Sequence, residues 1–191
     1  MPSEPTLLAF DTSAAHCAAA LFCDGRVVAS RVDDMARGQA EHLMPMLEGF
    51  LSENGKSWSD LTRIGVGTGP GNFTGIRISV SAARGLSLGL GIPAIGVSTL
   101  EALRHIHPSA TVAVVAPRNM IYAQHPNGAP THIAQSEAPD AVFALDPSAM
   151  ITALAEIAAQ ADAAKSERPK PLYIKPADAA PARDTAPVIL P

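Results

Sequence analysis

The stretch Gly-Thr-Gly-Pro-Gly-Asn-Phe-Thr-Gly-Ile-Arg, residues Gly67–Arg77, decides how this chain folds. It follows an apolar strand pattern at Arg63–Val66 and leads into a long apolar helix pattern at Ile76–Leu88. Because glycine alone accepts a positive φ without steric cost, glycines and a proline at such a junction prescribe the backbone path. They also remove side chains, so the main chain can approach a ligand phosphate or a packed element closely. The function depends on which of these two surfaces it meets.

The composition is typical of a folded globular protein, with 191 residues of which 47% are hydrophobic and 17% charged. The net charge of −4 and the lack of a visible basic face argue against a protein that grips nucleic acid alone. We expect the two cysteines, Cys17 and Cys23, to be free thiols, because an extended strand would hold them roughly 20 Å apart. With no signal-peptide pattern and no apolar span of membrane length, a cytoplasmic protein is expected.

Apolar periodicity predicts a mixed α/β chain whose first half has the order β-β-β-α-β-α-β-α. The elements expected there are strands at Thr6–Phe10, Cys17–Phe22, Arg26–Val32, Arg63–Gly67 and Ala94–Val97, and helices at Gln39–Asn54, Ile76–Leu88 and Thr99–Ile106. In the second half we expect strands at Thr111–Ala116, Met120–His125, Thr131–Ala134 and Leu172–Ile174, and an Ala-rich helix from about Pro147 to Ala164.

Two sites could hold a phosphate. The turn Asp11-Thr12-Ser13 offers hydroxyls and backbone amides, and its carboxylate could hold a magnesium-bound water; the same residues are also ordinary turn formers. The glycine stretch, with Gly69 and Gly71, leads into a helix N-terminus, where free amides favour an anion. It lacks the lysine of a P-loop and the downstream acidic residue of a Rossmann fingerprint. A tight, closely packed turn is the equal alternative.

Four segments, taken together, resemble the bacterial TsaB family, formerly YeaZ. They are Leu7–Ser13, Glu41–Leu47, Gly69–Arg77 and Gly91–Glu101, and they match in order and spacing over the first hundred residues. Pro171-Leu172-Tyr173-Ile174 resembles the C-terminal element of the family, whereas Thr111–Lys170 matches loosely.

The resemblance implies an α/β fold of the actin-like (ASKHA) type, with two RNase H-like lobes of which the second is reduced. We expect an N-terminal lobe at residues 1–104 that carries partner-binding helices, a smaller lobe at 105–175 and a Pro-rich tail at 176–191. The implied role is in the threonylcarbamoyl-adenosine modification of tRNA. In that system TsaD is the transferase, TsaE an ATPase, and TsaB the dimerisation subunit.

The resemblance also suggests which subunit carries the catalytic site. TsaD-type enzymes carry a metal-binding His-x-x-x-His, and here Thr99 and Leu103 stand where the two histidines would be, so no metal is expected on this chain. The family often has Asp-Ala-Arg where this chain reads Ala116-Pro117-Arg118. We therefore expect a non-catalytic subunit that binds no cofactor of its own, with ATP and metal on the partner subunits and Asp11–Ser13, Gly69 and Gly71 as a vestigial phosphate loop.

The expected partner surface lies on the first two long helices. Their apolar residues should pack against the matching helices of TsaD, and the same face could form a homodimer; the residues expected there are Leu43, Met46, Leu47, Phe50, Ile76, Ser79, Val80 and Ala83. TsaE is a further expected partner, and any tRNA contact is indirect or shared. The alternative is an ASKHA-type ATP-dependent phosphotransferase that uses Asp11 and the glycine stretch around a nucleotide.

Overall fold

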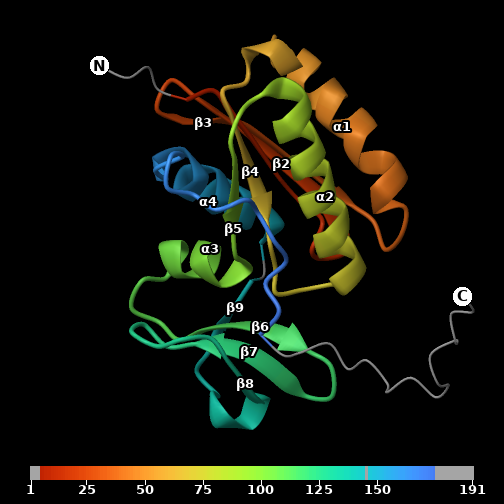
Figure 1. Cartoon of the computed structure of the whole chain (residues 1–191). Coiled ribbons are helices and arrows are strands. Elements are labelled where there is room, and N and C mark those ends of the chain that lie inside the picture. Colours follow the sequence, from red (N-terminus) through yellow and green to blue (C-terminus); the bar gives the residue numbers. More distant parts are fainter. Residues whose placement is uncertain (1–4, 145, 175–191) are drawn as a thin grey trace, which may run out of the picture.

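The computed structural model describes residues 5–144 and 146–174, which form two sheets and four α-helices (Figure 1). The larger sheet has the strand order β3-β2-β1-β4-β5. Its strands are β1 (Leu7–Asp11), β2 (His16–Cys23), β3 (Arg26–Asp34), β4 (Arg63–Gly67) and β5 (Ala94–Val97). The first three are antiparallel, while β4 runs parallel to both β1 and β5. Asp24-Gly25 forms the hairpin turn between β2 and β3, with φ of 52° and 77° at its two residues.

Helices cover both faces of this sheet. Helices α1 (Gln39–Glu53) and α2 (Phe73–Leu90) lie on one face and α4 (Pro147–Gln160) on the other (Figure 1). Strand β1 shows why both faces must be covered, because alternate residues of a strand point to opposite sides. Leu8 and Phe10 enter the core beneath α1 and α2, whereas Leu7 and Ala9 enter the core beneath α4.

The smaller sheet has the order β8-β7-β6-β9 and lies at the other end of the molecule (Figure 1). Its strands are β6 (Val112–Ala116), β7 (Met120–Gln124), β8 (Thr131–Ala134) and β9 (Val142–Phe143). Helix α3 (Thr99–Ile106) joins the sheets and packs on β6. It starts with a capping box, in which Ser98 Oγ accepts from the Glu101 amide at 3.1 Å and the Glu101 carboxylate accepts from the Ser98 amide at 2.6 Å. Two short 3-10 turns complete the fold, η1 (Trp58–Asp60) and η2 (Gln135–Glu137).

Helix α4 is where the structure differs most from the expected organisation. The sequence assigned this Ala-rich helix to the smaller lobe, yet it packs on the five-stranded sheet. Gly65 of β4 permits the approach, because a Cβ there would come within 2.9 Å of Ala158 Cβ. The Arg63 guanidinium donates to three carbonyls at the end of α4, over 2.8–2.9 Å, and so caps its C-terminus. The remaining boundary, near residue 104, stays a prediction.

Smaller differences concern the ends of elements. Helix α2 starts three residues earlier than expected, because the Asn72 side chain accepts from the Gly75 amide at 2.8 Å and caps it. Helix α4 ends at Gln160 rather than near Ala164. The expected strand at Leu172–Ile174 is wrong: this segment joins neither sheet, although the Leu172 amide donates to the Thr68 carbonyl at 2.9 Å. The Pro-rich tail predicted at 176–191 lies outside the described residues.

Candidate functional site

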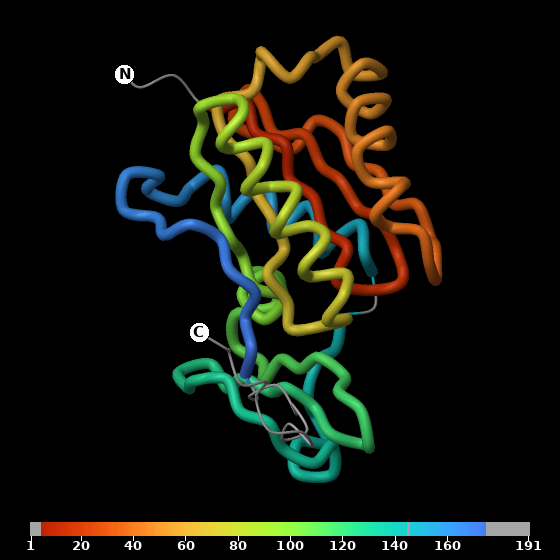
Figure 2. Tube along the Cα trace, turned by 45° about the vertical axis from the view of Figure 1, so that its right-hand side comes forward, coloured from red at the N-terminus to blue at the C-terminus, as the bar shows by residue number. Residues whose placement is uncertain are grey.

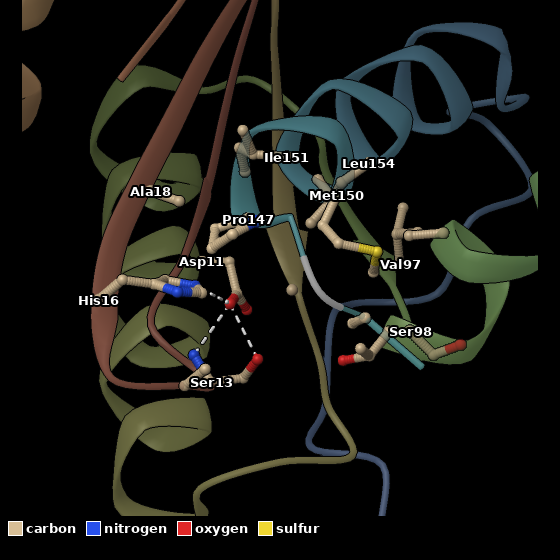
Figure 3. Close-up of a pocket in the computed structure, with 15 residues that line it drawn as sticks. Asp11, Ser13, His16, Ala18, Val97, Ser98, Pro147, Met150, Ile151 and Leu154 are labelled. Atoms are coloured by element: carbon tan, nitrogen blue, oxygen red, sulfur yellow. Dashed lines mark hydrogen bonds and ion pairs between the residues drawn. The ribbon is translucent and has the colours of Figure 1, made fainter. Parts of the chain in front are cut away.

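The end of β1 is the centre of the candidate site. One carboxylate oxygen of Asp11, Oδ2, accepts from the Ser13 amide at 3.0 Å and from the Ser13 hydroxyl at 2.8 Å, and it lies 3.2 Å from His16 Nε2 (Figure 3). The other, Oδ1, is buried and has no hydrogen-bond partner among the described residues. Oδ1 lies against Gly67, where a Cβ would collide with it. The carboxylate is therefore held from one side and sealed on the other.

The glycine stretch packs directly on this turn. A Cβ on Gly71 would collide with the Ser13 carbonyl, and a Cβ on Gly75 would collide with the Thr12 carbonyl. Gly69 has a φ of +84°, a left-handed conformation that favours glycine. The surface that the glycines allow the main chain to approach is therefore the Asp11–Ser13 turn of the same chain.

Hydrogen bonds join the two segments. The Asn72 amide donates to the Ser13 carbonyl at 2.6 Å, and the Thr12 hydroxyl donates to the Gly75 carbonyl at 2.7 Å. The structure thus brings together the five residues that the sequence singled out for a phosphate, Asp11, Thr12, Ser13, Gly69 and Gly71. It uses the Thr12 and Ser13 hydroxyls, and the Ser13 and Asn72 amides, for internal bonds. Their assignment as a vestigial phosphate loop stays a prediction.

A pocket of about 140 Å³ opens beside Asp11 (Figure 3). Its polar end carries the carboxylate, Ser13 and His16, while its far wall is apolar and comes mostly from α4. That wall and its floor include Ala18, Val97, Ala102, Met150, Ile151 and Leu154. A small ligand with one polar group and an apolar body would match this lining.

Sequence reasoning missed His16 and the α4 wall. The available signal for His16 was its place at the start of β2, since antiparallel pairing of β1 with β2 returns the chain to Asp11 across a short turn. No local signal pointed to Met150 or Leu154, because they reach the site only through the long-range packing of α4.

The two positions expected to have lost metal-binding histidines have structural contacts. The Thr99 hydroxyl donates to the Pro70 carbonyl at 3.1 Å, and the Thr99 amide donates to the Gly69 carbonyl at 2.8 Å. Leu103 is buried between α3 and β6. These contacts anchor α3 to the glycine stretch. Within residues 5–144 and 146–174, no three His, Cys, Asp or Glu side chains gather as metal ligands.

The eight residues expected at a partner surface lie inside the molecule. All are buried beneath α1 and α2, with exposures of 3% or less, and most pack against β1, β2 and β4: Leu43, Met46, Leu47, Phe50, Ile76, Ser79, Val80 and Ala83. The correction has a simple cause. The apolar stripe that reveals an amphipathic helix is the stripe that its own sheet buries, so a partner surface on these helices must use other residues.

A charged cluster joins α1 to β3 on the outside of this core. Asp33 accepts from Arg31 Nε at 2.9 Å and pairs with His42 Nε2 at 2.7 Å. The Arg31 hydrogen bond, reinforced by His42 and opposed by burial, holds the pKa of the Asp33 carboxyl below its ordinary value of 3.8. Nearby, burial and then the charges of Asp33 and Asp11 raise the pKa of the Cys17 thiol to about 11.

Residues 29–178 match the model of the family described as TsaD, tRNA N6-adenosine threonylcarbamoyltransferase. The chain belongs to this family. The match covers β4, β5, the smaller sheet and all four α-helices, but not β1 and β2, so at its C-terminal end it extends well beyond the segments that carried the resemblance at the level of sequence.

Curated relatives place the chain near TsaB. The Escherichia coli protein named tRNA threonylcarbamoyladenosine biosynthesis protein TsaB is 42% identical over 49% of this chain and 40% of its own length. The Haemophilus influenzae protein of that name is 32% identical over 61% and 52%, and the Bacillus subtilis one 33% identical over 64% and 57%. The chain thus spans about half the length of the curated relatives it matches. The resemblance to TsaB is confirmed.

Solved structures agree on the fold. YeaZ from Pseudomonas aeruginosa superposes with a TM-score of 0.69 and 25% identity over 88% of this chain and 99% of that one. A second Pseudomonas aeruginosa protein, described as similar to peptidase YeaZ, gives a TM-score of 0.72 at 23% identity over 90% and 100%. The chain has the expected actin-like, two-lobe fold. Among its described residues, no helix is long and apolar enough to cross a membrane.

Proposed function

We propose that this chain acts in tRNA threonylcarbamoyladenosine biosynthesis as a non-catalytic subunit. It dimerises with a TsaD-type transferase and supports threonylcarbamoyl transfer to the adenosine next to the tRNA anticodon. ATP and metal are held by the partner subunits, TsaE joins the complex, and any tRNA contact is indirect or shared. The setting is the cytoplasm. The names of the curated relatives and the family match support the pathway.

The observation that carries the dimerisation is a set of glycines inside exposed helices. Gly49 of α1 and Gly85 and Gly89 of α2 each have open space where a Cβ would stand, with no atom of the neighbouring described residues within 4 Å. Glycine in a helix interior costs about 1 kcal/mol relative to alanine, and packing among the described residues does not require it at these positions. Such glycines are explained if another backbone approaches the helices closely.

The same two helices also carry exposed apolar side chains. Leu88 of α2 is 86% exposed and Met44 of α1 is 39% exposed. We call the surface of Met44, Gly49, Gly85, Leu88 and Gly89 the partner face. A large exposed leucine beside glycines supplies apolar area to a helix pair from another chain. The same face could pair two copies of this chain, because isologous contacts reuse one patch.

The geometry around Asp11 supports a subunit without chemistry of its own. The carboxylate oxygen Oδ1 is sealed against Gly67, and Oδ2 already has three partners. Thr99 and Leu103, at the positions of the metal-binding histidines in TsaD-type enzymes, fasten α3 to the glycine stretch and to β6. These side chains hold the site together rather than presenting a reactive group.

The experiment is co-elution with a TsaD-type partner on size exclusion. The double variant Gly85→Gln with Leu88→Arg should remove the partner from the peak, because it adds bulk and charge to the partner face. The matched control is Val115→Arg, which places the same charge on another exposed apolar position, 67% exposed, in β6. Co-elution retained by the double variant would place the interface elsewhere.

A further inference from the structure

Strand β3 forms one edge of the larger sheet, and β5 forms the other. The edge at β5 is covered, because the segment 161–174 runs beside it (Figure 2) and Pro169 Cβ lies 3.3 Å from where a Cβ on Gly96 would stand. Along β3, by contrast, no segment of residues 5–144 or 146–174 adds main-chain hydrogen bonds to the outer side. An open edge of nine residues is a template on which another strand can pair.

The hydrogen bonds between β2 and β3 show which main-chain groups point to this open edge. The Met35 amide, directly after β3, donates to the Ala15 carbonyl at 3.0 Å, toward the β2 side. Because hydrogen-bonded pairs alternate along an antiparallel ladder, every second residue before Met35 also bonds to β2, as far back as the bulge in β3. The N–H and C=O groups of the residues between them, Ser30, Val32 and Asp34, therefore point outward. These groups have no hydrogen-bond partner among the described residues.

Two side chains of opposite charge stand two positions apart on this edge. Arg31 and Asp33 point to the same face of the sheet, where Arg31 Nε donates to Asp33 Oδ1 at 2.9 Å. Both remain partly exposed, at 35% and 23%. A guanidinium has five N–H donors, of which the contacts among described residues use one at Nε and one at Nη1. The arginine can therefore donate to a second carboxylate that another strand brings beside it.

We propose that two copies of this chain pair edge to edge through β3, antiparallel about a two-fold axis at Val32. Val32 then lies opposite Val32 of the second copy, and Ser30 lies opposite Asp34, so the outward main-chain groups of all three residues gain partners. Arg31 lies opposite the Asp33 of the second copy, at a position where cross-strand side chains are closest. This inference goes beyond the proposed function, because it adds an interface that leaves the partner face free.

Charge and backbone geometry select this register. A pairing centred on Arg31 would place two arginines opposite each other, and one centred on Asp33 would place two carboxylates opposite each other; both are unfavourable. A pairing centred on Ser30 would bring the bulge at Val28 into the ladder and interrupt it. The edge is thus complementary to itself in one register, as a two-fold contact between identical chains requires.

The test is sedimentation velocity of the full chain at several protein concentrations. We expect the unmodified chain to approach twice its mass of 19.7 kDa as its concentration rises. Arg31→Asp places carboxylates opposite each other, and Asp33→Arg places arginines opposite each other, so each variant alone should self-associate about tenfold more weakly or less still. The matched control is Arg26→Asp, a charge reversal in β3 before the bulge and outside the paired stretch, which should leave self-association unchanged.

Mixing the two variants separates an interface from a structural effect. Arg31→Asp chains and Asp33→Arg chains have each lost their internal ion pair, yet each places opposite charges against the other, so the mixture should form a heterodimer. A monomeric unmodified chain, dimers of both single variants, or a mixture that stays monomeric would overturn the proposal.

A further variant distinguishes this edge from the partner face. Gly85→Gln with Leu88→Arg should still form the β3 dimer, and its loss there with retention in Arg31→Asp would show that the copies pair through α1 and α2 instead, against the proposal. Arg31→Asp should still co-elute with a TsaD-type partner, so failure of this inference is separable from failure of the proposed function.

Discussion

The Thr12 hydroxyl donates to the Gly75 carbonyl at 2.7 Å, and the Thr12 carbonyl occupies the place of a Cβ on Gly75. This contact joins the end of β1 to the first turn of α2, two segments that are more than sixty residues apart in the chain. It explains why the stretch before α2 is rich in glycine. The glycines let α2 start directly against the β1 turn, and this start fixes which face of α2 meets the sheet.

Gly75→Ala should therefore destabilise the protein. The added methyl group meets backbone, which cannot move aside as a side chain can, and overpacking of this kind costs about 1–3 kcal/mol. Gly85→Ala is the matched control in the same helix, where the Cβ meets open space and should add up to about 1 kcal/mol of stability. Urea unfolding of both variants measures the difference. Equal effects would contradict the close contact with Thr12.

Leu47→Asp should unfold the chain, although the sequence placed Leu47 at a partner surface. The side chain is fully buried in the core beneath α1, and an unpaired carboxylate there costs several kcal/mol in effective terms. Leu88→Asp, on the exposed face of α2, should leave the free energy of unfolding within about 0.5 kcal/mol of that of the unmodified protein. Thermal unfolding followed by circular dichroism distinguishes them. A folded Leu47→Asp protein would contradict the orientation of α1.

Asp33 should contribute to stability above its ordinary pKa and lose that contribution in acid. Its pKa is lowered in the folded state, so the folded protein binds this proton less tightly than the unfolded chain does. The free energy of unfolding should fall as the pH drops below 3.8 toward the lowered value. Asp33→Asn should be less stable than the parent at neutral pH and lose less stability over that window. Urea midpoints measured from neutral pH down to about pH 3 test this, and parallel curves for the two proteins would refute it.

Cys17 should be unreactive in the folded protein. Its thiol is fully buried, and its pKa of about 11 leaves almost no thiolate at neutral pH. In a Cys23→Ala background, a thiol reagent such as Ellman's should label the chain only after denaturation. Because the folded pKa is raised, the free energy of unfolding should also fall as the pH rises from 9 toward 11. Rapid labelling of the native protein would show that Cys17 in β2 is accessible to solvent, which would contradict its burial.

The sequence predicted the helices but not the direction they face. The spacing of Leu43, Leu47 and Phe50 correctly predicted α1, expected at residues 39–54 and found at 39–53, because a buried stripe repeats with the period of the helix. The same spacing could not show whether the chain's own sheet or a partner protein covers the stripe, because both produce the same sequence pattern. Only the structure shows that α1 and α2 bury this stripe themselves. What they present outward are glycines such as Gly85, which carry no apolar signal.

Long-range packing accounts for what else was missed at the site. Asp11 and Ser13 could be singled out because they are adjacent in sequence and follow a strand. Ile151 and Leu154 reach the pocket only because α4 crosses back onto the first sheet after an intervening sheet. The sequence of an Ala-rich helix has too little contrast between apolar and polar residues to indicate which sheet the helix covers. Gly65 and Ala158, the two small residues that permit its approach, are recognisable as a pair only in three dimensions.

The central claim is that this chain is a partner subunit required for tRNA modification, and reconstitution tests it most directly. Threonylcarbamoyl-adenosine formation on tRNA should be measured with TsaD, TsaE, ATP and their substrates, with and without this chain. We predict full activity only when the chain is present, and loss of activity with the Gly85→Gln, Leu88→Arg variant. Full activity in the absence of the chain would contradict the account.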